Sequence, residues 1–186
     1  MKKIILAGFL FAGFTAAVQG APDDDSRPPE ARVENDYIVF YLIPRTPEPM
    51  AAFYEGRGFP VAAVEEVKRH CFITAGMRNT GQTVLWLEPR YWRFWDATGR
   101  EIKRLDRNYW KRRWQALDLP AAQRATFGWT LLPESRDLQP DEPVGGNIVL
   151  PATEGPMTIQ VRFRTGRDKR GPDLVLEFEG IRCPRS

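Results

Sequence analysis

Apolar side chains at every second position are the feature of this sequence that most restricts its fold. The segment MTIQVRF at 157–163 shows the pattern most clearly, since Met157, Ile159, Val161 and Phe163 alternate with polar residues. Successive side chains of a β-strand point to opposite faces, so the pattern predicts a strand with one buried and one solvated face. A chain built from such segments must bury the apolar face of each sheet against a second layer.

Segments of similar composition recur along the chain with turn residues between them. The segment YIVFYLI at 37–43 is apolar on both faces, which predicts a central strand covered on both sides. Hairpin turns are expected at NTGQ and DATG. The other predicted strands are 71–78, TVLWLEP, YWRFW, REIKRL, RATFGWTLLP, GGNIVLP and DLVLEFEGIRC. About eight short strands of this kind predict a mostly β protein built as an antiparallel β-sandwich.

Two stretches break the strand pattern. Residues 46–70 predict an insert of two short helices after the first strand, in which Thr46 caps the first helix and Pro60 begins the second. Residues 107–117 predict a third helix, which is short and basic. The sandwich is therefore expected to carry helices at two points of the chain.

The N-terminus has the features of a secretory signal peptide, because two lysines precede an apolar run at 4–14 and small residues follow at cleavage-site spacing. A membrane anchor is the alternative, but the run is shorter than the roughly 20 residues needed to cross a bilayer. We therefore predict a signal peptide at 1–20, a disordered leader at 21–32 and a single domain at 33–186. No cysteine follows the run to accept a lipid, so a soluble periplasmic or secreted protein is expected, without a transmembrane segment after cleavage.

Removal of the signal peptide would also change the charge of the protein. The chain has 27 Lys and Arg residues against 24 Asp and Glu residues. Two of the basic residues and none of the acidic residues lie at 1–20, so 25 basic residues would remain against 24 acidic ones. The basic excess of the whole chain is therefore weak support for a nucleic-acid partner, which an exported protein would also seldom meet.

The two cysteines, Cys71 and Cys183, predict one structural disulfide in an oxidising compartment. The only histidine, His70, precedes Cys71, but adjacent residues at a helix-to-strand junction point apart and cannot form a thiol and imidazole catalytic pair. No partner lies at a recognised ligand spacing from His70, so we predict neither a metal nor a cofactor. His70 is instead expected to be a solvated residue at a helix end.

The end of the last predicted strand has two possible arrangements. The alternating apolar residues of 174–178 share a face that Ile181 and Cys183 do not reach unless the register shifts by one residue. A β-bulge at Gly180 would supply the shift, because glycine readily adopts the backbone angles of a bulge. In the alternative, Cys183 simply lies beyond the strand.

The runs MRNTGQTVLWL, DATGREI and LQPDEPVGGNIVLPATEGPMTIQVRF resemble the layout of exported bacterial immunoglobulin-like domains, including the telokin-like group. In that layout a strand ending in Asn precedes an aspartate-glycine turn, a Pro/Glu segment and a Gly strand ending in Leu-Pro. The resemblance covers roughly residues 71–181 and implies an immunoglobulin-like β-sandwich in an exported setting. The chain departs from the pattern in the insert at 46–70 and in the Trp-rich segment at 106–117, where any particular function is expected to lie.

Motifs typical of enzymes are absent from the sequence, including the Walker loop, the dinucleotide glycine fingerprint, the zinc-protease motif and the Gly-x-Ser-x-Gly elbow. A single histidine also removes most Ser/His and Cys/His arrangements. The acidic residues Glu134, Asp137, Asp141 and Glu142 cluster among prolines, which indicates a solvated turn. A hydrolase whose carboxylates converge from distant loops stays an alternative.

The strongest functional signal is a basic and aromatic segment, since residues 100–113 hold seven Lys or Arg against two acidic residues. In one interpretation its tryptophans pin a connection between the two sheets, and the arginine stems cover apolar surface. In the other, the segment is a surface for anionic lipid or polysaccharide, with the indoles at the interface. The candidate residues of that surface are Arg104, Arg107, Trp110, Lys111, Arg112, Arg113 and Trp114.

Three classes of function follow from these patterns. The favoured class is an exported, non-catalytic binding or assembly module of the bacterial cell envelope, which contacts a protein partner through sheet edges or the helical insert. The second is a binder of anionic lipid or polysaccharide through residues 100–117. The third is a hydrolase with dispersed carboxylates.

Overall fold

The computed structural model describes residues 31–184, so the predicted signal peptide and most of the predicted leader lie outside the described residues. The strand β1 (Ala31–Glu34) includes Ala31 and Arg32, so the prediction that the leader extends to residue 32 is wrong. β1 pairs antiparallel with β2 (Ile38–Arg45), and its inward residues Ala31 and Val33 pack on the core. Pairing with a neighbouring strand therefore orders a segment whose own composition gives no strand signal.

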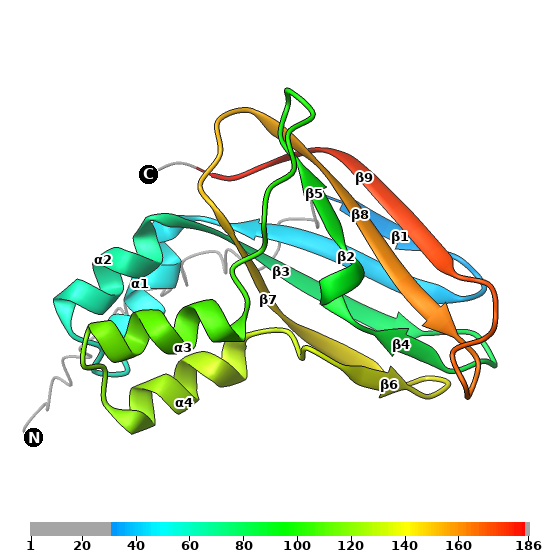
Figure 1. Cartoon of the computed structure of the whole chain (residues 1–186), viewed down its shortest axis with the longest axis horizontal. Coiled ribbons are helices and arrows are strands. Elements are labelled where there is room, and N and C mark those ends of the chain that lie inside the picture. Colours follow the sequence, from blue (N-terminus) through cyan, green and yellow to red (C-terminus); the bar gives the residue numbers. More distant parts are fainter. Residues whose placement is uncertain (1–30, 185–186) are drawn as a thin grey trace, which may run out of the picture.

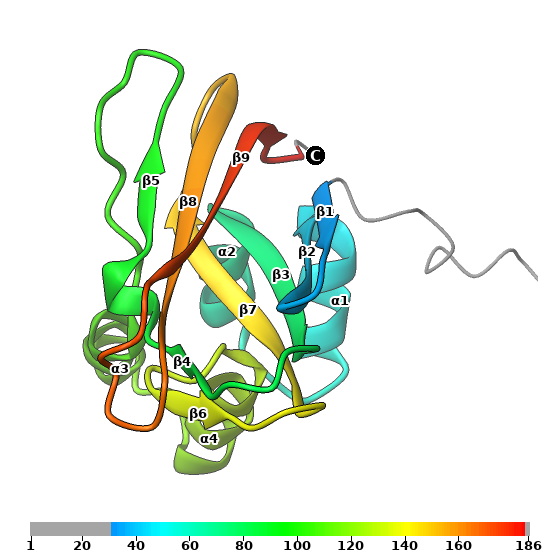
Figure 2. The ribbon, with the colours of Figure 1, turned by 90° about the vertical axis from the view of Figure 1, so that its right-hand side faces the viewer.

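Two antiparallel sheets form the β part of the fold. Sheet A has the strand order β1-β2-β3-β7, which adds β3 (His70–Asn79) and β7 (Pro143–Pro151). In sheet B, β8 (Pro156–Thr165) pairs with β9 (Leu174–Arg182) along one edge and with β4 and β5 along the other. The remaining strands of sheet B are β4 (Leu85–Leu87), β5 (Arg93–Trp95) and β6 (Arg136–Leu138), which pairs with β4. Figure 2 separates β5, β8 and β9 of sheet B from β1, β2 and β3 of sheet A.

Four helices lie within the described residues and gather at one end of the molecule, at the left of Figure 1. The helices α1 (Pro47–Glu55) and α2 (Val61–Lys68) connect β2 to β3, close to their predicted positions. The helices α3 (Arg107–Ala116) and α4 (Ala121–Thr130) lie between β5 and β6 in the chain, and a short 3₁₀ turn, η2 (Pro89–Tyr91), precedes β5. Because β1 comes first, the helical insert follows the second strand and not the first.

Sheet A contributes to two separate cores because its strands alternate. One core lies between the sheets and contains Cys71, Ile73 and their neighbours on β7. The other lies between sheet A and the helices and contains Phe72 of β3 and Val149 of β7. The structure is therefore three layers deep at the helical end, with sheet A in the middle. The antiparallel, mostly β architecture predicted from the alternation is confirmed.

The segment RATFGWTLLP is helical, so the strand predicted there is wrong. Residues 121–130 form α4, and Phe127 is 1% exposed in the helical core. Local composition favours a strand, because Thr, Phe and Trp have high β-propensity. Packing of Phe127 against the rings of α3 overrides that preference. The predicted strand REIKRL is also wrong, since only Glu101 makes an isolated bridge, to Trp95.

Both arrangements considered for the C-terminal strand occur together. Met157 pairs with Ile181 and Ile159 with Phe178, so β9 carries one extra residue opposite β8. Gly180 has φ +76°, which an L-residue rarely adopts. The resulting bulge turns Ile181 into the core, where it is 1% exposed. Cys183 lies just beyond the end of β9, as the second arrangement expects.

Gly146 of β7 lies close against the backbone of the segment that follows α4. A Cβ at this position would lie 2.6 Å from the backbone nitrogen of Leu132, whose N–H donates to the Asn147 carbonyl. Gly146→Ala is therefore expected to lower the free energy of unfolding by about 2–3 kcal/mol, because backbone must move to admit the methyl group. Urea denaturation measures the free energy of unfolding of the wild type and the variant. Gly145→Ala is the matched control, since its Cβ would meet Ala75 oxygen at 3.5 Å; equal effects of the two substitutions would contradict the steric argument.

Candidate anion-binding groove between two helices

The start of α3 is fixed by two hydrogen bonds. The Asp106 carboxylate caps the helix by accepting from the Tyr109 backbone N–H at 2.8 Å. Just before it, the Leu105 N–H donates to the Val149 carbonyl at 2.9 Å, which ties the helix to β7. The turn at 117–120 then returns the chain antiparallel as α4, as Figure 1 shows. The helical pair is called the α3–α4 hairpin below.

Trp110 and Trp114 are buried, as in the structural interpretation of the segment and not as exposed interface residues. They are 1% and 2% exposed and stack with ring centroids 4.9 Å apart. Phe127 of α4 lies 4.7 Å from the Trp110 ring and 4.9 Å from the Trp114 ring. Four-residue spacing places both indoles on the side of α3 that faces sheet A and α4, where burial of their large apolar area is favourable. Neither indole N–H has a hydrogen-bond partner among the described residues.

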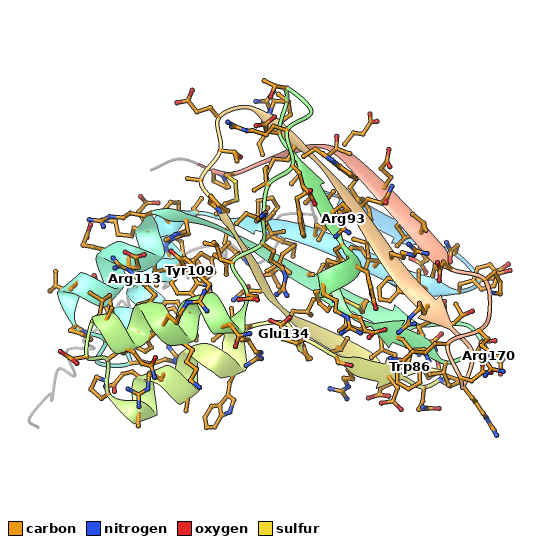
Figure 3. All side chains as sticks on the ribbon, in the orientation of Figure 1. Trp86, Arg93, Tyr109, Arg113, Glu134 and Arg170 are labelled. Atoms are coloured by element: carbon orange, nitrogen blue, oxygen red, sulfur yellow. A yellow bond between two sulfur atoms is a disulfide. The ribbon has the colours of Figure 1, made fainter. Side chains whose placement is uncertain are left out.

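Arg104 and Arg113, also predicted to face an anionic ligand, are held by carboxylates of the chain itself. Arg104 makes two hydrogen bonds to Glu134, one of them at 3.1 Å. Arg113 donates to Glu66 of α2 at 2.6 Å, and the Glu66 side chain is only 5% exposed. This hydrogen bond from Arg113 lowers the pKa of Glu66, against the effect of burial, and the same bond raises the pKa of Arg113. Arg113 therefore fastens α3 to α2, and Arg104 fastens the segment before α3 to Glu134, which follows α4; Figure 3 labels Arg113 and Glu134.

Three other cations line a groove of about 200 Å³ between α3 and α4. Arg107 reaches over Gly128 and donates to the Leu131 carbonyl at 3.1 Å, and Arg124 donates to the Leu119 carbonyl at 2.8 Å. Lys111 is exposed. No carboxylate within residues 31–184 forms an ion pair with any of the three. The other residues that line the groove are Trp110, Trp114, Phe127, Gly128 and Leu131.

The groove therefore joins an aromatic floor to a rim of unneutralised positive charge. Guanidinium and ammonium groups bind phosphate and carboxylate oxygens through charge-assisted hydrogen bonds. The aromatic floor suits an apolar substituent of the same molecule. Of the seven predicted residues, Arg107, Trp110, Lys111 and Trp114 line the groove, and Arg112 is exposed outside it. Arg124 was missed because its segment has the local composition of a strand.

His70 is half-buried and not the solvated helix-end residue that the sequence predicts. Its Nδ1 lies 2.8 Å from the Glu66 carbonyl oxygen, and its ring packs edge-on against Trp110 at 5.1 Å. Cys71 faces the other core, where it forms a disulfide with Cys183 across a Cα–Cα distance of 5.5 Å. The two neighbours thus point to opposite faces of sheet A, and both are engaged in packing.

A second charged cluster, on sheet B, surrounds a buried carboxylate. Glu88 is 3% exposed at its side chain and forms ion pairs with Arg90 at 2.7 Å, Arg164 at 2.9 Å and Lys169 at 3.2 Å. The Lys169 ammonium also lies 4.2 Å from the centre of the Trp86 ring. Lys169 has φ +63°, a conformation that costs free energy in a non-glycine residue. These cations have partners within the chain, so the cluster is an ion-pair network around Glu88.

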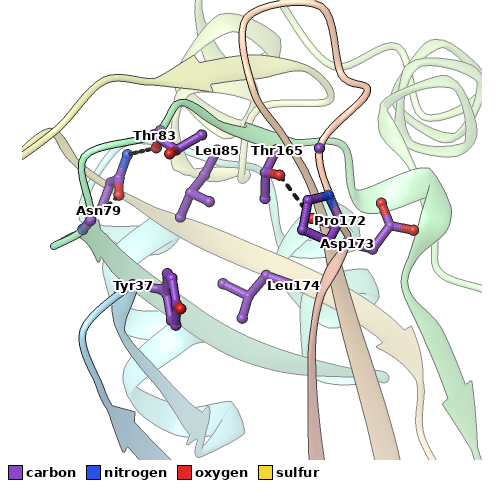
Figure 4. A pocket seen from close by; sticks show the side chains of 10 residues that line it. Tyr37, Asn79, Thr83, Leu85, Thr165, Pro172, Asp173 and Leu174 are labelled. Atoms are coloured by element: carbon purple, nitrogen blue, oxygen red, sulfur yellow. Dashed lines mark hydrogen bonds between the residues drawn. The ribbon is translucent and has the colours of Figure 1, made fainter.

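A larger pocket, of about 380 Å³, opens at the end of the sandwich opposite the helices (Figure 4). Its wall includes the apolar side chains of Tyr37, Leu85 and Leu174. The polar groups there are occupied: the Asn79 amide donates to the Thr83 carbonyl at 2.9 Å, and Asp173 accepts from Arg162 at 2.7 Å. This pocket offers little polar specificity, and the α3–α4 groove is the better candidate for a binding site.

The predicted acidic turn is dispersed among ion pairs. Asp141 pairs with Arg78 at 3.0 Å, and Glu142 pairs with Arg136. Within residues 31–184, no group of three or more His, Cys, Asp and Glu side chains could hold a metal ion. None of the helices in this part of the chain has the length and apolar character required to cross a membrane.

Comparison with known proteins yields no family for this chain, since no family model and no curated protein matches it. Two solved structures from Bacillus subtilis are similar at low identity. One is ycdA, a lipoprotein candidate, with 11% identity and a TM-score of 0.44 over 82% of this chain and 39% of that chain. The other is the yjhA protein, with 9% identity and a TM-score of 0.43 over 81% of this chain and 97% of its own. The chain thus spans well under half the length of ycdA.

Proposed function

We propose that the protein is an exported, non-catalytic binding module that holds an anionic amphiphile in the α3–α4 groove. The observation that carries this proposal is the rim of the groove, where the side chains of Arg107, Lys111 and Arg124 form no ion pair with a carboxylate of residues 31–184, while neighbouring Arg104 and Arg113 are neutralised. Three cations at one groove repel one another unless an anion is present. The Cys71–Cys183 disulfide and the signal-like sequence at 1–20 support the exported setting.

Hexyl phosphate, a short anionic amphiphile, is the probe that tests the proposal. We expect Lys111→Ala/Arg124→Ala to weaken its binding roughly tenfold or more, because each cation supplies a charge-assisted contact. Isothermal titration measures the affinity, and hexanol serves as the uncharged ligand. Arg170→Ala is the control variant, since Arg170 is 85% exposed at the opposite end of the molecule. If the double substitution did not change the affinity for hexyl phosphate, or if hexanol bound with equal affinity, the proposal would be refuted.

Assembly with a protein partner is a second candidate function, and the edge of sheet B favours it. β9 is paired on one side only, to β8, and Val175 on this strand is 48% exposed. An open edge strand can accept a strand from another chain. The exposed charges of Glu177, Glu179 and Arg182 oppose uncontrolled pairing. As part of this second proposal, the single domain is an immunoglobulin-like β-sandwich of the telokin-like group.

A hydrolase with dispersed carboxylates is the least supported function. Glu88 is one of the two buried glutamates of the described chain, and burial alone would raise its pKa. Hydrogen bonds from Arg164 and Lys169 outweigh burial and lower the pKa of Glu88 below its usual range. Glu66 is likewise held ionised by Arg113. Neither group has the raised pKa that a general acid requires at neutral pH.

A further inference from the structure

One large apolar side chain stands in solvent on the α3–α4 hairpin. Trp129 of α4 is 83% exposed, the highest value for a large apolar side chain within residues 31–184. The exposed residues Ala122 and Ala125 precede it at seven and four positions, on the same side of the helix. Gly128, the residue before Trp129, lines the groove. The exposed indole therefore projects from the helix that forms one wall of the cationic groove, about 100° round the helix axis from Gly128.

The charge of this surface is one-sided. Residues 107–130 contain five basic residues and a single acidic residue, Asp118 in the turn between the helices. Glu66 neutralises one of the five, Arg113. The remaining four are Arg107, Lys111, Arg112 and Arg124, and no carboxylate of the described chain pairs with them. The hairpin is thus an outer surface with net positive charge and one projecting indole.

We propose that the α3–α4 hairpin docks on a bilayer that contains anionic phospholipid, with Trp129 in the interfacial region and a lipid phosphate in the groove. The inference rests on the proposed function and names the source of the anionic amphiphile. Indoles partition to membrane interfaces because the ring is apolar and its N–H is polar. Each cation near an anionic leaflet makes its own contribution to the binding free energy, and no defined contact geometry is required. The two exposed alanines on the Trp129 side of α4 add apolar surface beside the indole, which suits a bilayer interface better than a soluble polysaccharide.

The binding of the purified protein to lipid vesicles tests the inference. Vesicles of phosphatidylcholine mixed with phosphatidylglycerol are compared with vesicles of phosphatidylcholine alone, by cosedimentation at low and high salt. We expect binding to the mixed vesicles only, and loss of that binding at high salt. Trp129→Ala should lower the partition coefficient roughly tenfold, because the indole no longer enters the interface. Lys111→Ala/Arg124→Ala should lower it roughly twenty-five-fold, which corresponds to about fivefold for each cation.

Tyr37→Ala is the matched control for Trp129→Ala, since Tyr37 is 63% exposed and lines the pocket at the other end of the sandwich. Wild-type binding to both kinds of vesicle, or equal vesicle binding by Trp129→Ala and Tyr37→Ala, would overturn the membrane inference. Binding of hexyl phosphate without binding to vesicles would overturn it too, while leaving the proposed function intact. Failure to bind either probe would overturn both.

Discussion

Glu88→Gln is expected to lower the free energy of unfolding by about 2–3 kcal/mol, although glutamine has nearly the same shape. The Glu88 carboxylate is the common partner of Arg90, Arg164 and Lys169. Without it, Arg164 and Lys169, whose side chains are 33% and 25% exposed, keep their charge in a partly desolvated site. Removal of one partner of a fully buried ion pair costs about 3–5 kcal/mol, and we expect less here because water reaches the cations.

The same variant should also change the pH dependence of stability. The pKa of Glu88 is lowered in the folded protein, so its carboxylate stabilises the fold above about pH 4.5, the ordinary pKa of glutamate. That contribution is lost as the pH falls through the lower, folded-state pKa. The wild type should therefore lose stability on acidification, and Glu88→Gln should lose less. Urea unfolding at neutral and acidic pH measures both effects.

Glu101→Gln is the control for Glu88→Gln, because it removes a carboxylate that is 53% exposed and paired at 3.6 Å with Arg93. Exposed ion pairs contribute roughly 0–1 kcal/mol, so this variant should resemble the wild type. If Glu88→Gln were as stable as Glu101→Gln at neutral pH, the three cations would not depend on Glu88, and the cluster would not be a stabilising network.

Removal of the disulfide is expected to have the largest effect on stability. Cys71 and Cys183 are 112 residues apart. A cross-link across a loop of this size lowers the chain entropy of the unfolded state, which amounts to about 5 kcal/mol in the chain-entropy model. Cys71→Ala/Cys183→Ala should therefore unfold at much lower urea concentration than the wild type. The cavity left at Cys71, which is 4% exposed, adds to the loss.

The reducing agent dithiothreitol provides the internal control for the disulfide. It should lower the unfolding midpoint of the wild type toward that of the double alanine variant and leave the variant itself unchanged. If the oxidised wild type and the variant had the same midpoint, the cross-link would not contribute to stability.

Elements whose conformation is determined by residues close together in the chain could be predicted from the sequence. The alternation at 157–163 gave β8, and the glycine at 180 gave the bulge, because both signals lie within a few residues. The helices of the insert were found for the same reason. In contrast, α4 has the local composition of a strand and is helical because Phe127 packs against both Trp110 and Trp114. That contact joins separate elements and leaves no pattern within either one.

The candidate site was predicted in part, for a similar reason. Helical periodicity placed Arg107 and Lys111 in one row of α3, next to the side that carries the indoles. It could not show which side of the helix faces sheet A, so a structural role and a surface role of Trp110 and Trp114 both stayed open. The partners of Arg104 and Arg113 lie 30 and 47 residues away, at Glu134 and Glu66. Only the tertiary structure distinguishes these neutralised cations from the free ones.

The two cores of sheet A differ in how they are held, and this difference sets how the molecule can open. The core between the sheets is closed by the disulfide at Cys71. The helical core has no covalent link and is held to the sheet by packing around Phe72 and Val149 and by the anchoring of Leu105. Sub-global openings take the least firmly held unit first, so the helical layer can separate while the sandwich stays closed. A ligand that binds between α3 and α4 only in the closed molecule would raise the free energy of that opening, and the increase would grow with the ratio of ligand concentration to Kd.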